Sequence, residues 1–211
     1  MVQGMKAPID FYFDFSSPYS YIASEWIEAV AARHGRAVQW HAILLGVTFQ
    51  AAELKSPVEH PMKREYSLRD FARSARFAGL PYEMPSRFPI STQNAARIFW
   101  WLHDTQSPER ATAWAHAGLR AYFTRGTDLS QPEALTALAA EDGLDTAAAL
   151  GAFTDLIWKE RLKRENAAAI AAGVFGAPFL IVDGEPFWGN DRRAQIEQWL
   201  GGQADFVHTV S

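Results

Sequence analysis

The chain has 211 residues, of which 48% are hydrophobic and 21% are charged, and its formal net charge at pH 7 is −4. This length suffices for one globular domain, or for one domain with a large insertion. The net negative charge argues against nucleic acid or an anionic membrane as a partner, and no segment approaches the length of a membrane span. The first residues lack a signal-peptide pattern, so we expect a soluble cytoplasmic protein.

Cysteine is absent from the sequence. Its absence excludes disulfides, thiolate metal sites and cysteine nucleophiles together. The six histidines show no spacing typical of metal ligands, so no metal site is predicted. A sulfur nucleophile, if the protein uses one, has to arrive with a bound small molecule.

The first part of the chain predicts a strand that turns into a helix. Residues 9–13 alternate in the manner of a strand, and apolar residues then recur at helical spacing as far as Val30. Ser17 suits the N-cap of this helix and Pro18 suits its first position. A helix N-terminus stabilises a nearby anion, so an anion could bind beside Ser17. The simpler interpretation, in which Ser17 only caps its own helix, is favoured by these residues alone.

A second strand is predicted over residues 37–44, parallel to the first in a βαβ unit. Residues 50–61 contain two prolines and mixed charges and are predicted to form a loop. From Pro61 to about Gly173 the pattern is helical. Residues 95–102 are apolar nearly all round, which indicates a buried helix.

Strands return at residues 179–182 and 185–188, joined by a strong hairpin signal at Asp183-Gly184. A final helix should follow, with Asn190 as its N-cap and Asp191 in its first turn. These two residues could bind a carboxylate and an ammonium group, or they could be an ordinary cap and an acid that compensates the helix dipole.

This order of elements predicts an α/β, thioredoxin-like fold that is split by a helical insertion. Residues 1–49 and 174–211 are expected to form the thioredoxin-like domain, and residues 50–173 the insertion. We expect a groove between the two parts.

Ala177-Pro178 stands at the start of a predicted strand, where proline cannot donate a ladder hydrogen bond. If this peptide bond is cis, the backbone of Ala177 could pair with an extended peptide ligand. Most X–Pro bonds are trans, and the residues alone favour that isomer.

Three motifs together resemble the 2-hydroxychromene-2-carboxylate isomerases, which are relatives of the kappa-class glutathione transferases and of the DsbA-type oxidoreductases. The motifs are residues 11–21 (FYFDFSSPYSY), 173–178 (GVFGAP) and 187–192 (FWGNDR). The likeness covers essentially the whole chain. It implies a thioredoxin-like fold with a large all-helical insertion, glutathione as cofactor, a small aromatic substrate and a homodimer. The absence of cysteine at positions 16–21 separates the chain from the disulfide-exchanging branch.

The resemblance also implies roles for individual residues. Ser17 would contact the glutathione sulfur as the catalytic residue. The residues implied in glutathione binding are Lys63, Ala177, Pro178, Trp188, Gly189, Asn190 and Asp191. Phe49, Gln50 and Phe88 would line the substrate side of the groove. Leu54 and Phe88 stand where the resembled enzymes carry a polar residue and a tyrosine-bearing segment, so this side differs from theirs.

The implied activity is a glutathione-dependent cis–trans isomerisation in aromatic catabolism. It would interconvert 2-hydroxychromene-2-carboxylate-type and trans-o-hydroxybenzylidenepyruvate-type compounds through reversible addition of the thiolate. Two alternatives remain open. One is a kappa-like transferase that consumes glutathione by conjugating electrophiles, and the other is a glutathione-binding module without turnover.

Overall fold

A computed structural model describes residues 6–202, and within it four strands form one sheet in the order β2-β1-β3-β4. Strand β1 (Ile9–Phe13) is parallel to β2 (Val38–Ala42) and antiparallel to β3 (Phe179–Val182), while β4 (Glu185–Trp188) is antiparallel to β3. The predicted βαβ unit and hairpin are therefore confirmed, although β2 is shorter than residues 37–44. The hairpin turn has positive φ at Asp183 (54°) and Gly184 (84°), as a two-residue type I′ turn requires.

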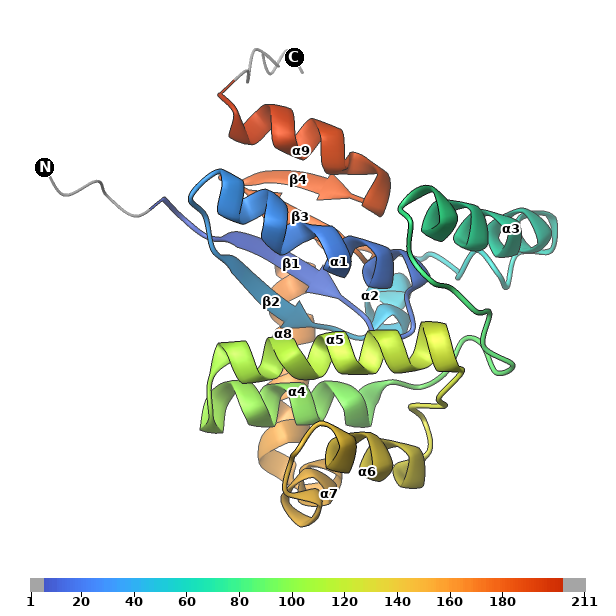
Figure 1. Ribbon diagram of the computed structural model, residues 1–211, viewed down its shortest axis with the longest axis vertical. Helices are drawn as coiled ribbons and strands as arrows, with labels where there is room; N and C mark the ends of the chain where they lie inside the picture. The colour runs from blue at the N-terminus through green and yellow to red at the C-terminus, as the bar shows by residue number, and fades with distance from the viewer. Residues whose placement is uncertain (1–5, 203–211) are drawn as a thin grey trace, which may run out of the picture.

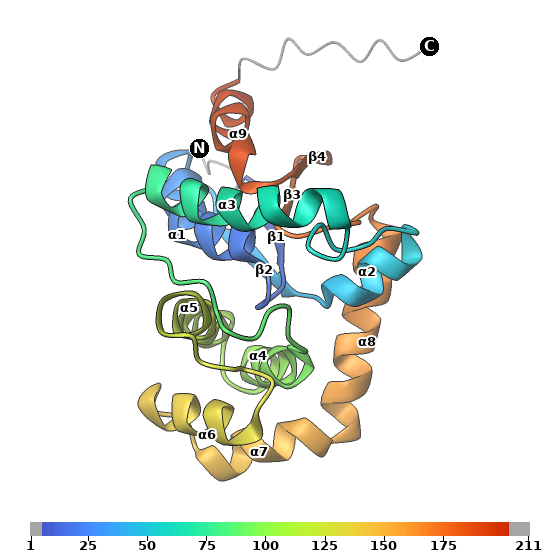
Figure 2. The ribbon, with the colours of Figure 1, turned by 90° about the vertical axis from the view of Figure 1, so that its right-hand side faces the viewer.

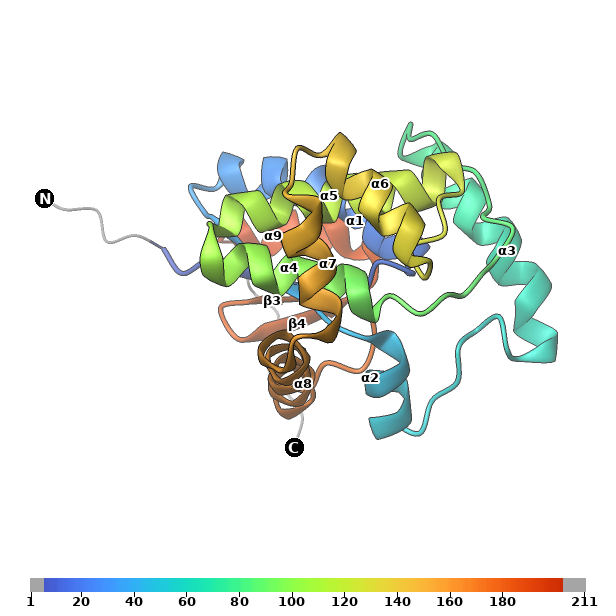
Figure 3. The same cartoon turned by 90° about the horizontal axis from the view of Figure 1, so that it is seen from below.

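Helices cover both faces of the sheet (Figures 1 and 3). Helices α1 (Pro18–Arg33) and α9 (Arg193–Leu200) pack on the face that carries Phe11 and Phe13. On the other face, Tyr12 packs against the end of α8 (Leu156–Ala171). The alternation of side chains along β1 thus supplies two separate apolar layers.

From Pro61 to Ala171 most of the chain between β2 and β3 is helical, as predicted, and residues 52–60 and 78–92 are non-helical connections. Besides α8 the chain between these two strands contains α2 (Leu45–Ala51), α3 (Pro61–Phe77), α4 (Gln93–Thr105), α5 (Pro108–Arg125), α6 (Pro132–Glu141) and α7 (Thr146–Thr154). Helices α4 and α5 lie side by side below the sheet, with α6 and α7 beneath them (Figure 2). The predicted buried helix is α4, whose Trp100 is 1% exposed and donates its indole N–H to the carbonyl of Ala42 at 3.0 Å.

Two local predictions are wrong. Residue Gln50 lies in α2 rather than in a loop, because a seven-residue helix is too short to show a clear hydrophobic period. Asn190 does not cap the last helix. Residues Asn190–Arg192 form a short 3₁₀ turn, η1, whose N-cap is Gly189 without any side-chain cap bond. Gly189 has a φ of 108°, which glycine adopts readily and other residues rarely do. The helical segment therefore begins after Gly189, one residue earlier than predicted.

Helix α3 stands beside the sheet rather than over it (Figures 1 and 2). It packs against α1 through aromatic rings, since the ring centroid of Phe71 lies 5.2 Å from that of Tyr19. The ring of Phe71 also lies 5.8 Å from that of Phe88, in the connection that follows α3. The sheet order and this arrangement of helices define a thioredoxin-like fold with a helical insertion, as predicted. No helix within residues 6–202 is long and apolar enough to cross a membrane.

Candidate active site

A cleft of about 1110 Å³ opens beside the N-terminus of α1. Its lining comes from the β1–α1 junction, α2 and the loop after it, α3, residues 88–92, Ala177-Pro178 and the start of η1. The cleft therefore lies between parts of the chain that are far apart in sequence. This size suits a drug-sized ligand or two smaller ones.

The structure brings nearly all the candidate residues to this cleft. The lining includes Ser17, Phe49, Gln50, Phe88, Ala177, Pro178, Trp188, Gly189, Asn190 and Asp191. Lys63 is exposed on the first turn of α3 and is not among the lining residues. Lys55, which was not a candidate, lines the cleft instead.

Ser17 is both a helix cap and a bridge across the fold. It has extended backbone angles (φ −91°, ψ 113°), and its hydroxyl oxygen accepts the N–H of Ser20 at 3.1 Å. The same hydroxyl donates to the carbonyl of Ala177 at 2.9 Å. Its exposed fraction is 3%, and it borders the cleft. The predicted cap is confirmed, and the donated proton points to the opposite wall.

The Ala177–Pro178 peptide bond is cis, against the isomer that the residues alone favour; Phe88–Pro89 is also cis. The carbonyl of Ala177 accepts the Ser17 hydroxyl. Among the hydrogen bonds within the described residues, none uses the N–H of Ala177. This donor therefore remains available to a ligand with an extended backbone.

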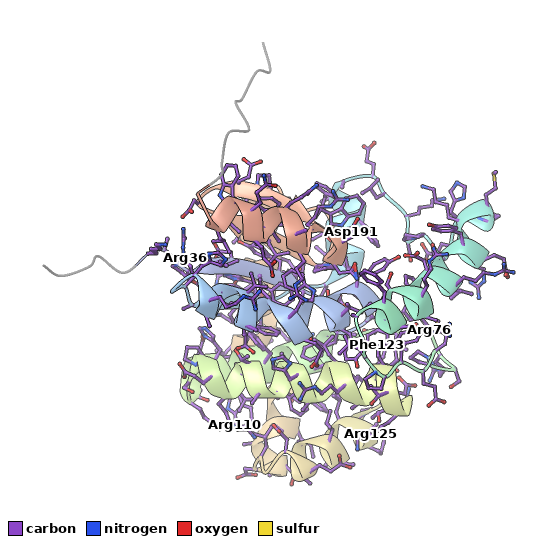
Figure 4. All side chains as sticks on the ribbon, turned by 45° about the horizontal axis from the view of Figure 1, so that its top comes forward. Arg36, Arg76, Arg110, Phe123, Arg125 and Asp191 are labelled. Carbon is purple, nitrogen blue, oxygen red and sulfur yellow. The ribbon has the colours of Figure 1, made fainter. Side chains whose placement is uncertain are left out.

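Trp188 lines the cleft, and its indole packs against Gly176. Its side chain is 53% exposed, and a Cβ at Gly176 would lie 2.5 Å from its indole Nε1. Asp191 lies at the start of the last helical segment, on the side of the molecule where α3 stands (Figure 4). Its carboxylate pairs with Arg192 at 2.7 Å. A negative and a positive side chain, Asp191 and Arg192, thus lie together in the cleft lining.

Two acidic residues of the cleft were not predicted. Asp14 is 3% exposed at the cleft floor, and burial raises the pKa of its carboxyl group despite several hydrogen bonds. The hydroxyl of Tyr19 donates to Asp70 of α3, which also pairs with Arg73. Burial and then Asp70 raise the pKa of Tyr19, whereas Tyr19 and Arg73 outweigh burial and lower the pKa of Asp70. The Asp-x-Ser spacing of residues 14–16 was the one local signal, since it is typical of an Asx turn.

Within the part of the chain that the structure describes, no group of three or more His, Asp or Glu side chains could hold a metal ion. The cleft lining offers hydroxyl groups such as that of Ser17, the charged side chains of Asp191 and Arg192, and aromatic surfaces.

Comparison with known proteins assigns the chain to the same class of fold that the sheet and its helices define. The DSBA-like thioredoxin domain family matches residues 8–201, and the chain belongs to this family. A 2-hydroxychromene-2-carboxylate isomerase of Pseudomonas sp. (strain C18) is 32% identical over 203 residues, covering 92% of this chain and 90% of the relative. The enzyme of the same name from Sphingobium xenophagum is 29% identical, covering 93% and 99%.

More distant relatives agree with this assignment. A solved structure of 2-hydroxychromene-2-carboxylate isomerase superimposes with a TM-score of 0.82 at 27% identity, over 92% of this chain and 95% of that chain. Glutathione S-transferase kappa 2 of Caenorhabditis elegans is 26% identical, covering 91% of each chain. Within the DSBA-like class, the chain belongs to the 2-hydroxychromene-2-carboxylate isomerase family and is an isomerase.

Proposed function

We propose that the protein is a glutathione-dependent cis–trans isomerase for aromatic compounds with a conjugated 2-oxo acid side chain, of the 2-hydroxychromene-2-carboxylate type. The observation that carries the proposal is the position of the Ser17 hydroxyl. It lies at the N-terminus of α1, on the cleft, 2.9 Å from the carbonyl of the residue before the cis-proline.

The residues of the cleft fit glutathione. The unused N–H of Ala177 suits the backbone of an extended peptide. Asp191 and Arg192 supply opposite charges for the zwitterionic γ-glutamyl end. Trp188 offers an exposed apolar surface in the same lining. The cleft has room for a second, aromatic ligand next to the tripeptide.

When bound, glutathione would supply a thiolate that adds reversibly to a conjugated double bond and so allows rotation about it. The protein supplies the conditions for that anion. The N-terminus of α1 carries partial positive charge, which lowers the pKa of a nearby thiol from its usual value of about 8.5. Each pKa unit corresponds to about 1.4 kcal/mol of preferential stabilisation of the anion.

Ser17 would contribute to this stabilisation by donating its hydroxyl proton to the thiolate instead of to the carbonyl of Ala177. Its proton is given to a neutral carbonyl in the free protein. A hydrogen bond to an ionised acceptor is about twice as strong as a neutral one, so a thiolate would compete successfully for the same proton. Ser17 thereby acts as a hydrogen-bond donor and does not itself need to be a nucleophile.

The aromatic substrate would lie between α2 and α3. Phe49, Phe71 and Phe88 line the cleft, and its polar lining residues include Lys55 in the loop after α2 and Ser74 on α3. Lys63, which the resemblance implies in glutathione binding, lies outside this lining, so we assign it no contact with glutathione or with the substrate. The protein would act on small molecules in the cytoplasm, where glutathione is the principal thiol. We expect a homodimer, as the family resemblance implies.

A kappa-like transferase activity is the second candidate, because a kappa-class relative matches over 91% of the chain. The two activities differ in mass balance. An isomerase returns all of its glutathione, whereas a transferase consumes one molecule for each electrophile. Product analysis with a limiting amount of glutathione separates them.

The test of the proposal is the absorbance of the bound glutathione thiolate as a function of pH. In the wild type we expect a thiol pKa lowered by about one unit or more, and in Ser17→Ala a pKa closer to that of free glutathione. Ser107→Ala is the matched control, since Ser107-Pro108 caps α5 in the same way. Absence of glutathione binding in calorimetry at millimolar concentration would refute the proposal.

A further inference from the structure

Asp14 is a buried acidic residue to which the proposed function gives no role. It directly follows β1, and its exposed fraction is only 3%. Burying an acidic side chain costs free energy unless hydrogen bonds compensate for the lost water. The partners of Asp14 therefore show what this burial achieves.

The carboxyl group of Asp14 accepts hydrogen bonds from three separate segments. Oδ1 accepts the N–H of Ser16 at 2.6 Å, the hydroxyl of Ser16 at 2.8 Å and the hydroxyl of Thr92 at 3.1 Å. Oδ2 accepts the N–H of Leu45 at 2.7 Å. Ser16 belongs to the β1–α1 junction, Leu45 begins α2 and Thr92 is the N-cap residue of α4. All three line the cleft.

We infer that Asp14 is a positioning residue of the active site, which holds three walls of the cleft together and aims the Ser17 hydroxyl. The backbone strengthens this link, because the N–H of Ser17 donates to the carbonyl of Asp14 at 3.0 Å. Ser17 is thus restrained from both sides, by Asp14 and by Ala177. The inference rests on the proposed function, in which Ser17 meets the thiol.

Burial raises the pKa of the Asp14 carboxyl group, although bonds from Leu45, Ser16 and Thr92 act in the opposite direction. Each of the four hydrogen bonds is accepted by a carboxyl oxygen, so Asp14 serves this junction as an acceptor on both of its oxygens.

Thr92→Val tests the inference without changing any charge. It is nearly isosteric and removes one of the four hydrogen bonds to Asp14. We expect kcat/KM to fall about 3- to 10-fold and the pKa of the bound thiol to move toward that of free glutathione. Thr92→Ser keeps the hydroxyl and should restore both values.

Asp14→Asn is the stronger variant. Its amide NH₂ replaces one acceptor oxygen and has to face either the N–H of Ser16 or the N–H of Leu45. We expect kcat/KM to fall about 10- to 100-fold, with the thiol pKa again raised. A lowered thiol pKa in Asp14→Asn would instead mean that Asp14 acts only as a repelling charge, and it would overturn the inference.

Asp128→Asn is the matched control. Asp128 forms the same turn, accepting the N–H and the hydroxyl of Ser130, and it does not line the cleft. This variant should keep the wild-type kinetics and thiol pKa. Wild-type values for Thr92→Val and Asp14→Asn, in a protein that binds glutathione and lowers its thiol pKa, would refute the role of Asp14 alone. Failure of the wild type to bind glutathione would refute the proposed function instead. If Asp14→Asn does not fold, Thr92→Val decides.

Discussion

The hydroxyl of Ser17 and the carbonyl of Ala177 are joined by a 2.9 Å hydrogen bond, although 160 positions separate the two residues in the chain. This bond connects the start of α1 to the cis-proline segment across the cleft. One small side chain therefore serves helix capping, tertiary structure and the proposed chemistry together.

The double structural role of Ser17 predicts a larger loss of stability than an ordinary cap substitution causes. Ser17→Ala should lower the free energy of unfolding by about 2–3 kcal/mol, combining a lost cap with an unsatisfied buried carbonyl. Ser107→Ala, which removes a cap alone, should cost about 1 kcal/mol. Urea denaturation of both variants measures the difference, and equal losses would contradict a stabilising contribution from the Ala177 bond.

Gly118 of α5 is expected to tolerate no side chain. A Cβ at this position would lie 2.6 Å from the ring of Phe15, which is fully buried in the connection between β1 and α1. Gly118→Ala should therefore destabilise the protein by about 1–3 kcal/mol. A Cβ at Gly151 in α7 would have no atom within 4 Å, so Gly151→Ala should stabilise the protein by about 0.5–1 kcal/mol. Thermal unfolding of the two variants should shift in opposite directions.

His116 should make stability depend on pH near neutrality. Burial lowers the pKa of its imidazole, but Glu25 and Glu28 together outweigh burial and raise it. Because the folded state holds the proton more tightly, this stabilisation is complete below the unfolded pKa of about 6.5 and is lost as pH rises through the higher folded pKa. The imidazole Nε2 lies 3.0 Å from Glu28.

The measurement is the free energy of unfolding of the wild type and His116→Gln between pH 5.5 and pH 9, a range chosen to span the unfolded pKa of about 6.5. The advantage of the wild type should be on the order of 1 kcal/mol at the acid end and should disappear at the alkaline end. Glu28→Gln should weaken this dependence. A constant difference across the range would show that the imidazole does not gain a proton on folding.

The bond between Tyr19 and Asp70 should affect the substrate side of the cleft. Tyr19→Phe keeps the packing against Phe71 but removes the hydroxyl that α1 donates to α3. The KM for the aromatic substrate should rise about 3- to 10-fold. Tyr21→Phe is the control. The hydroxyl of Tyr21 donates to the carbonyl of Pro81 at 2.8 Å, and neither residue lines the cleft. An equal effect of both variants would assign no special role to Tyr19.

Local patterns predicted most of the fold. The junction at Ser17-Pro18, the hairpin at Asp183-Gly184 and the buried helix α4 each depend on neighbouring residues, and each is confirmed. The start of the last helix was wrong because the positive φ of Gly189 brings the turn forward. The isomer of the Ala177–Pro178 bond could not be predicted, since tertiary context selects it.

The candidate site was predicted mainly by resemblance, and its supporting contacts were not. The links from Asp14 to Leu45 and Thr92, and from Tyr19 to Asp70, join segments that have no relation in local sequence. Lys55 lies in the loop after α2 and lines the cleft, whereas Lys63, eight positions later, lies on the first turn of α3 and does not. Which side chains line the cleft depends on how the helices and strands pack together, and the hydrophobic period of a segment does not predict that packing.

The sheet order has a consequence for biosynthesis. Strand β1 pairs with β2, which follows soon after it, and with β3, which follows only after all the inserted helices. A ribosome therefore delivers β3 only after all the inserted helices, at a time when helices α4 and α5 already have each other as local partners. A nascent chain that stops at the end of α8 carries Ser17 without Ala177, and so lacks one wall of its own cleft.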